Sequence, residues 1–314
     1  MTNTIGIDLG GTVIKIGLVQ DGVLTDRREM AAQSASGLKS QLPDLERNIH
    51  AMLKSNQLVQ KDLLGIGFSF AGLVDSRANR IISTNQKYDD GPDIDLVAWA
   101  KNNWDCPLFA ENDARVALLG EWQHGIGRGW ENIVMVTLGT GIGSGVLIEG
   151  RLLRGKHFQA GNLSGHFTVN HRGGKCTCGN IGCMEAETST WKLPDLIRSH
   201  LGFGTSTLQK ENTLDFEALF RHAASGDLVA TEVLDHCFSV WSAGIITMIH
   251  AFDPEVIILS GGIMKSAPVI IPQLQTRISE YAWTPWGKVQ ILVAQNINDA
   301  ALYGADYLVR SQLN

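Results

Sequence analysis

The chain has 314 residues, enough for one or two domains with sizeable buried cores. Its 26 lysines and arginines against 32 aspartates and glutamates give a net charge of −6, with no evident basic cluster. This composition excludes a general basic nucleic-acid binder, because phosphate contacts need clustered Lys and Arg side chains. Glycine is in excess: 12 of the 34 glycines fall between Gly139 and Gly182.

No targeting or membrane segment is evident. The N-terminus has no basic region and carries an acid at Asp8. The best uncharged run, 133–148, is broken by four glycines and is shorter than the roughly 20 apolar residues of a membrane-spanning helix. We therefore expect a cytoplasmic protein without a membrane partner, in which clustered thiols more often bind metal than pair.

Strands and helices are expected to alternate along the chain. In the first half we predict strands at 4–9 and 14–20, a helix at 38–54, a strand at 64–70, a helix at 94–104, a strand at 107–110 and a helix at 114–122. In the second half we predict strands at 133–138 and 146–148, helices at 188–201, 214–224 and 228–252, a strand at 256–259 and a helix at 300–310. The alternation indicates an α/β fold, and the recurring order of strand, glycine turn, strand indicates a duplication with two related halves facing each other across a cleft.

The first glycine turn reads Asp8-Leu-Gly10-Gly11-Thr12. Glycines let backbone N–H groups approach a phosphate, Thr12 adds a hydroxyl donor, and an acid at a strand end can hold a metal or its water shell. Lys15 on the following strand could supply a cation. The alternative is a plain hairpin turn with an N-terminal acid.

Two later glycine turns follow the same logic. From 139 to 145 every second residue is glycine, which would destabilise an ordinary strand and indicates that something approaches the backbone at Gly139, Thr140 and Gly141. Gly261 and Gly262 end an apolar strand, at the position where α/β proteins bind ligands. The alternatives are a packed glycine-rich hairpin and a tight strand-to-helix turn.

Two carboxylates and an amide stand together in Glu111-Asn112-Asp113, after a short strand. A carboxylate in a partly closed cleft can accept a hydroxyl proton, and an adjacent amide can fix the ligand that carries the hydroxyl. Asn and Asp also cap helices, which is the competing interpretation.

One imidazole and three thiols make a complete tetrahedral zinc set of the structural kind, with the ligands His166, Cys176, Cys178 and Cys183. His157 and His171 compete as the fourth ligand, and reduced thiols in a loop are the alternative. Cys106 and Cys237 stand in apolar surroundings and are expected in the core. Glu185 follows the last ligand closely and could bind a polyol or act as a helix N-terminal acid.

Taken together, these residues resemble the ROK family of sugar kinases along nearly the whole chain. The resemblance rests on the motifs Asp8-Leu-Gly-Gly-Thr12, Glu111-Asn-Asp113, Leu138-Gly-Thr-Gly-Ile-Gly-Ser-Gly145, the His166 and cysteine module, Ser260-Gly-Gly262 and the closing helix 300–305. It implies an α/β fold of two actin-like (ribonuclease H-like) domains flanking a nucleotide and sugar cleft. We place the smaller domain at 1–114 plus 300–314 and the larger at 115–299, with a zinc-binding loop at about 166–185.

The resemblance also implies roles. Asp113 would be the general base that takes a sugar hydroxyl proton, and the glycine turns would hold ATP with Asp8 near Mg²⁺. Sugar contacts would come from Asn112, Glu185, His166, Asn85 and Gly72. Zn²⁺ would be structural, and the family suggests a homodimer or a dimer of dimers.

The sequence departs from the family where many members carry Glu-x-Gly-His. Here the residues before His166 are Asn162, Leu163, Ser164 and Gly165, so one sugar contact is missing or altered. A DNA-binding repressor of the same family is disfavoured, because only seven residues precede Asp8. We predict ATP-dependent phosphorylation of a hexose or a related sugar, N-acetylated sugars included; the alternative is a non-catalytic sugar-sensing protein that lacks a DNA-binding domain.

Overall fold

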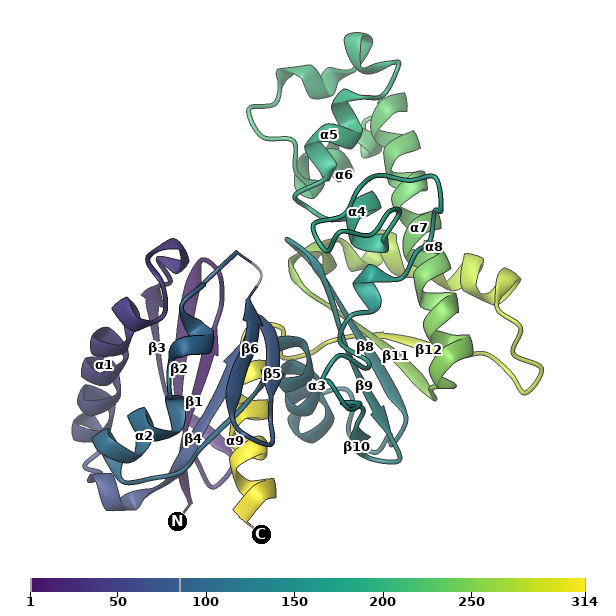
Figure 1. Cartoon of the computed structure of the whole chain (residues 1–314). Coiled ribbons are helices and arrows are strands. Elements are labelled where there is room, and N and C mark those ends of the chain that lie inside the picture. Colours follow the sequence, from purple (N-terminus) through teal and green to yellow (C-terminus); the bar gives the residue numbers. More distant parts are fainter. Residues whose placement is uncertain (1, 85, 314) are drawn as a thin grey trace. The chain divides into compact units, whose positions relative to one another are not determined.

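The computed structural model describes residues 2–84 and 86–313. The chain forms two compact units (Figure 1): the first comprises Met1–Gly129, Arg154–Ala160 and Gln295–Asn314, and the second comprises Trp130–Leu153 and Gly161–Ala294. These borders differ from those expected at residues 114 and 299. The reason is that the helix after residue 112 packs along the C-terminal helix, within the first unit.

The first unit is built on a five-stranded sheet in the order β3-β2-β1-β4-β7. Its elements are β1 (Asn3–Leu9), β2 (Val13–Gln20), β3 (Val23–Ala31), α1 (Leu42–Ser55), β4 (Leu63–Phe70), β5 (Gly72–Asp75), β6 (Arg80–Thr84), α2 (Leu96–Trp104), β7 (Leu108–Asn112), α3 (Asp113–His124) and α9 (Ala300–Leu313). β1, β4 and β7 run parallel, so their carboxyl ends meet at one edge of the sheet. β5 and β6 form a separate hairpin.

Helix α9, yellow in Figure 1, packs on β1 and β4 and along α3. Glycines allow the two helices to touch through their backbones. A Cβ on Gly120 would lie 1.8 Å from the Ala300 carbonyl oxygen, and one on Gly304 would lie 1.8 Å from that of Val116. The C-terminal segment is therefore an integral layer of the first unit.

The second unit repeats the sheet plan, in the order β10-β9-β8-β11-β12. Its elements are β8 (Ile133–Leu138), β9 (Ile142–Ile148), β10 (Arg151–Leu152), α4 (Met184–Thr188), α5 (Leu193–Arg198), α6 (Phe216–Ala224), α7 (Leu228–Phe252), β11 (Val256–Ser260), α8 (Ala267–Tyr281) and β12 (Gln290–Val293). Here β8 pairs antiparallel with β9 and parallel with β11, as β1 does with β2 and β4. The matching order bears out the predicted duplication.

The core of the second unit gathers around α7, the 25-residue helix whose Trp241 and Cys237 are fully buried. The side chain of Asp227 caps this helix by accepting a hydrogen bond from the Ala230 N–H. Cys106 is likewise buried in the first unit, so both isolated cysteines are core residues, as predicted. Within residues 2–84 and 86–313, no helix combines the length and the apolar character needed to cross a membrane.

Candidate functional site

Three parallel strands bring polar side chains to one edge of the first sheet. Asp8 at the end of β1 stands in register with Ser69 of β4, and Phe70 of β4 stands in register with Asn112 of β7. The Ser69 hydroxyl donates to Asp8 Oδ1 at 2.9 Å. Parallel register thus gathers residues that lie far apart in the sequence.

The Asp8 carboxylate is held on both sides. Lys15 Nζ lies 3.8 Å from Asp8 Oδ2 and donates to the Asn298 carbonyl oxygen at 2.7 Å. Burial raises the pKa of Asp8, and the Lys15 charge and the Ser69 hydrogen bond oppose that rise.

Asp113 is the first residue of α3 and is half-buried. Its Oδ1 accepts the Ala114 N–H at 2.8 Å and the Asn112 Nδ2 at 2.9 Å. No described residue donates a hydrogen bond to Oδ2. Burial raises the pKa of Asp113 to about 6, and the nearby Asp8 charge adds to the rise, while hydrogen bonds and the Lys87 ammonium oppose it. A carboxyl group with this pKa is suited to accept a proton near neutral pH.

Asn112 is the N-cap of α3, which confirms the alternative interpretation of this motif as a helix cap. Its Oδ1 accepts the Arg115 N–H at 3.3 Å, and its Nδ2 also donates to the Gly72 carbonyl oxygen at 3.0 Å. Gly72 has no room for a side chain, because a Cβ would lie 2.4 Å from the Ser83 carbonyl oxygen. The remaining predicted sugar contact of this region, Asn85, lies outside the described residues.

Glu111, the residue before Asn112, carries a fully buried carboxylate. Arg154 Nε donates to its Oε2 at 2.6 Å, and Oε1 accepts Arg115 Nη1 at 3.2 Å and the Asn112 N–H at 3.0 Å. Arg115 Nη2 also donates to the Ala160 carbonyl oxygen at 2.5 Å. The ion cluster therefore fastens segment Arg154–Ala160 to the start of the helix that carries Asp113.

The first glycine turn closes the β1–β2 hairpin. The Gly10 N–H donates to the Asp8 carbonyl oxygen at 3.1 Å, and the Tyr88 hydroxyl donates to the Gly10 carbonyl oxygen at 2.9 Å. A Cβ on Gly10 would lie 2.5 Å from the Val13 carbonyl oxygen, so the turn requires glycine there. Thr12 is exposed at the tip.

The second glycine turn closes the β8–β9 hairpin and rests on a buried acid. Glu185, in the first turn of α4, accepts the Ile142 N–H at 2.8 Å through Oε2. A Cβ on Gly141 would lie 2.5 Å from that oxygen, so the carboxylate lies directly against the turn. Around Gly139, by contrast, the space is open, and Thr140 at the tip is exposed.

The third glycine turn follows β11 in the same unit. Gly261 has a φ of 98°, and a Cβ there would lie 2.2 Å from the Leu138 carbonyl oxygen. Gly262 faces open space. The turn therefore lies against the end of β8, where the second glycine turn begins.

One atom from each of His166, Cys176, Cys178 and Cys183 falls within 4.8 Å of all the others. His166 Nδ1 is 3.5 Å from Cys176 Sγ, and Cys178 Sγ is 3.7 Å from Cys183 Sγ. One imidazole and three thiolates at this spacing fit a closed tetrahedral zinc site. Neither His157 nor His171 belongs to this cluster of described residues.

The loop around the four ligands is tied to the second glycine turn. Cys183 bridges Thr168 in a short antiparallel pair, and Glu187 Oε1 accepts the Gly174 N–H at 2.7 Å. Glu185, two residues after Cys183, reaches the glycine turn. A metal that fixes Cys183 would therefore also fix Glu185.

The altered segment before His166 is buried. Asn162 and Ser164 are 6% and 1% exposed. The Ser164 N–H donates to Ser144 Oγ at 3.1 Å. Asn162 Oδ1 and Ser164 Oγ have no hydrogen-bond partner among the described residues. Both atoms therefore have unused capacity for a ligand or a water molecule.

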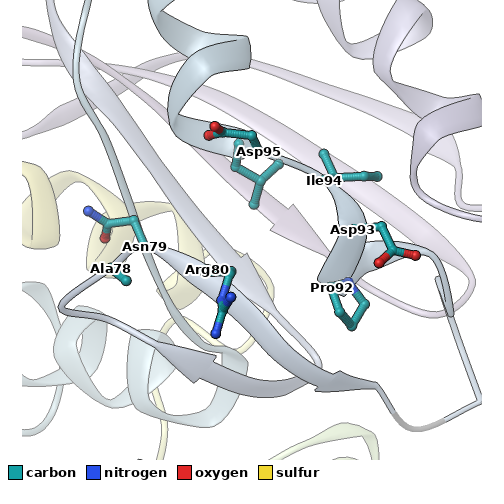
Figure 2. A pocket seen from close by; sticks show the side chains of 8 residues that line it. Ala78, Asn79, Arg80, Pro92, Asp93, Ile94 and Asp95 are labelled. Carbon is teal, nitrogen blue, oxygen red and sulfur yellow. The ribbon is translucent and has the colours of Figure 1, made fainter.

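A cavity of about 270 Å³ also opens in the first unit (Figure 2). It is lined by Ala78, Asn79, Arg80, Pro92, Asp93, Ile94, Asp95 and Leu96. None of these is a predicted site residue. Asn79 and Asp95 already serve the fold, because they accept the backbone N–H groups of Ala110 and Ala98.

Sequence reasoning missed Ser69 and Lys87. Ser69 is the one hydroxyl in an apolar strand and could have been flagged, because it stands next to the strand end. Lys87 lies in a loop with no motif, and only the fold brings it to the first glycine turn.

The family model described as "ROK family" matches residues 4–312. The chain is 30% identical to the glucokinase of Thermotoga maritima, over 98% of each chain, and 27% identical to the xylose repressor of Bacillus subtilis, over 95% of this chain and 74% of the repressor. It is similar to the ROK hexokinase structure from Thermus thermophilus (TM-score 0.83, 27% identity, 99% of each chain). It is also similar to the Streptomyces griseus ROK glucokinase in complex with glucose and AMPPNP (TM-score 0.78, 26% identity, 98% and 99%). The expected two-domain, actin-like α/β fold is confirmed by these likenesses.

Proposed function

Because the chain belongs to the ROK family, we propose that it transfers the γ-phosphoryl group of ATP to a hydroxyl of a hexose or a related sugar, N-acetylated sugars included. The observation that carries the proposal is Asp113: a half-buried carboxylate at a helix start, with one oxygen held by two donors and a pKa raised to about 6.

In this mechanism Asp113 Oδ2 accepts the proton of the sugar hydroxyl as that oxygen forms its bond to the γ-phosphorus. The bond from phosphorus to the bridging oxygen breaks, and ADP leaves. At neutral pH most of the carboxyl is ionised, and its raised pKa makes it a better proton acceptor than an ordinary aspartate. The hydrogen bonds from Ala114 and Asn112 fix its orientation.

The glycine turns at Gly10–Gly11, Gly139–Gly141 and Gly261–Gly262 would present backbone N–H groups to the nucleotide phosphates. Asp8 fits a magnesium ion, because Mg²⁺ in such sites takes one or two carboxylates together with substrate phosphates. When bound, Mg²⁺ would neutralise phosphate charge. Lys15 and Ser69 hold the Asp8 carboxylate in place for it.

On the sugar side, Asn112, Gly72, His166 and Glu185 are the proposed contacts. His166 would use Nδ1 for zinc, since that atom faces Cys176, and would leave Nε2 for a hydroxyl. The unpartnered Asn162 Oδ1 and Ser164 Oγ are candidates for selecting among sugars, in the segment that departs from the family pattern. We also propose an assembly of two or four copies, which sedimentation velocity would test.

A sugar-binding protein without catalysis is the second candidate. The match to the Bacillus subtilis xylose repressor and the altered segment before His166 favour it. The two candidates differ in one outcome, since a sensor binds sugar but leaves ATP intact.

The test is a coupled ADP-release screen over a panel of hexoses, hexosamines and N-acetylated hexosamines. We expect at least one sugar to stimulate ADP release, and Asp113→Asn to lower that rate by roughly 10²–10⁴-fold. Asp93→Asn, an exposed carboxylate in the same unit, is the matched control and should leave the rate unchanged. Absence of stimulation by every sugar, or a rate within a few-fold in Asp113→Asn, would overturn the proposal.

A further inference from the structure

Lys87 lies across the first glycine turn. A Cβ on Gly11 would meet Lys87 Nζ at 2.5 Å, Cε at 2.8 Å and Cδ at 3.1 Å. The side chain is half-buried, and its stem follows the backbone of the turn. The ammonium group therefore lies beside the first glycine turn, which is the proposed binding element for a nucleotide phosphate.

The segment that carries Lys87 is hydrogen-bonded to that turn and has a strained backbone conformation. Gln86 and Tyr88 adopt left-handed φ angles of 57° and 55°, which non-glycine residues rarely do. Tyr88 is buried, its N–H donates to the Ser34 carbonyl oxygen at 2.9 Å, and its hydroxyl donates to the Gly10 carbonyl oxygen at 2.9 Å. Such strain persists only where the surrounding structure imposes it, and it concentrates at functional sites.

Two lysines lie near the first glycine turn, and only Lys15 is paired with a described residue. Lys15 forms an ion pair with Asp8 and donates a hydrogen bond to the Asn298 carbonyl oxygen. Lys87 has no hydrogen bond or ion pair with any described residue, although its charge acts on Asp113. The Asp113 carboxylate would repel a transferred phosphoryl group, so a cation that lies beside the first glycine turn and acts electrostatically on Asp113 meets an electrostatic need.

We propose that the Lys87 ammonium binds a non-bridging oxygen of the γ-phosphoryl group over the first glycine turn and neutralises its charge during transfer. This inference rests on the proposed function. No bond to Lys87 forms or breaks: the hydroxyl proton goes to Asp113, the phosphoryl group goes to the sugar oxygen, and ADP leaves with the electron pair of the broken bond.

Nucleotide affinity gives a test that does not need turnover. Isothermal titration with Mg²⁺-AMPPNP and with Mg²⁺-ADP separates a contact to the γ-phosphoryl group from contacts to the rest of the nucleotide. We expect Lys87→Met to weaken AMPPNP binding about tenfold or more, as loss of a charge-assisted hydrogen bond does, and to leave ADP binding within about twofold. Lys87→Arg should recover most of the affinity, and Lys61→Met, an exposed lysine of the same unit, should match the unaltered chain.

Turnover gives the second readout. With a sugar that stimulates ADP release, Lys87→Met should lower kcat by roughly 10²–10³-fold while the Kd for sugar alone stays within about twofold. Thermal melting of Lys87→Met and Lys87→Arg shows whether both variants are folded. Equal AMPPNP affinity in Lys87→Met and the unaltered chain, or no AMPPNP binding by either, would overturn the inference. Lys87-dependent AMPPNP binding without turnover of any sugar would sustain it and overturn only the proposed function.

Discussion

Replacing the buried Glu111 by glutamine should destabilise the first unit. The carboxylate is 0% exposed and accepts hydrogen bonds from Arg115, Arg154 and the Asn112 N–H, while the Arg115 side chain is itself 0% exposed. Glutamine keeps the shape but removes the negative charge, and its amide nitrogen faces a guanidinium donor. Removing one partner of a buried ion pair costs about 3–5 kcal/mol of unfolding free energy.

Urea unfolding of the unaltered chain and of Glu111→Gln measures this cost. The matched control is Asp44→Asn, which breaks the ion pair with Arg47, an exposed pair on α1 expected to contribute at most about 1 kcal/mol. Because the same cluster fastens Arg154–Ala160, limited proteolysis of Glu111→Gln should show faster cleavage in that segment. A loss of unfolding free energy below about 1 kcal/mol for Glu111→Gln would contradict a stabilising role of the ion cluster in the first unit.

Three further predictions concern protonation, the metal and a turn. The mechanism requires the ionised form of Asp113, whose pKa is raised to about 6. Therefore kcat/KM should fall as the pH drops through that value, and the fall should approach tenfold per pH unit below it. A flat profile of kcat/KM from pH 5 to 8 would contradict this prediction. Cys178 is exposed, so Cys178→Ser removes a ligand without a packing defect. Elemental analysis should find about one zinc per chain in the unaltered protein and in the control Thr177→Ser, and much less in Cys178→Ser, together with a lower Tm. Gly261→Ala should lower the unfolding free energy by about 1–3 kcal/mol, because its methyl group would meet the Leu138 carbonyl oxygen at a position with a left-handed φ. Gly262 faces open space, so Gly262→Ala should change the unfolding free energy little. Equal urea midpoints for the two variants would contradict this prediction.

Much of the fold could be predicted from periodicity. The two glycine hairpins, the long helix Leu228–Phe252 and the buried strand Val256–Ser260 stand within a few residues of their expected bounds. Each carries a strong local signal, either an apolar run or a helical stripe, that the tertiary structure does not override.

Other elements carry no such signal. Strand β3 was missed because its sequence VLTDRREMA is charged and its residues alternate between exposed and half-buried, as in an edge strand. The helix expected at 188–201 is broken into the end of α4 and the short α5, where Pro194 sets a new helix start. Helix α8 was missed in a stretch whose helical pattern includes two prolines, Pro268 and Pro272.

The candidate site likewise contains residues that a local sequence pattern reveals and residues that it does not. Metal spacing and the glycine turns are local patterns, so His166 and its cysteine partners could be proposed from the sequence and come together in the structure. The approach of Lys87 to Gly11 spans 76 positions, and the ion pair of Glu111 with Arg154 spans 43. The pair of Glu111 with Arg115 is local but depends on burial, which spacing does not encode. Long-range register, such as that of Asp8 with Ser69, has to be read from the fold.

The most direct measurement is the amount of phosphorylated sugar formed from ATP labelled in the γ-phosphoryl group, with the unaltered chain and with Asp113→Asn at equal sugar occupancy. The proposed mechanism requires that the label appears on the sugar with the unaltered chain. Asp113→Asn keeps the shape of the side chain but cannot accept the proton, so it should form labelled sugar roughly 10²–10⁴ times more slowly. Labelled sugar formed at equal rates by both proteins, or no labelled sugar from any member of the panel, would contradict it.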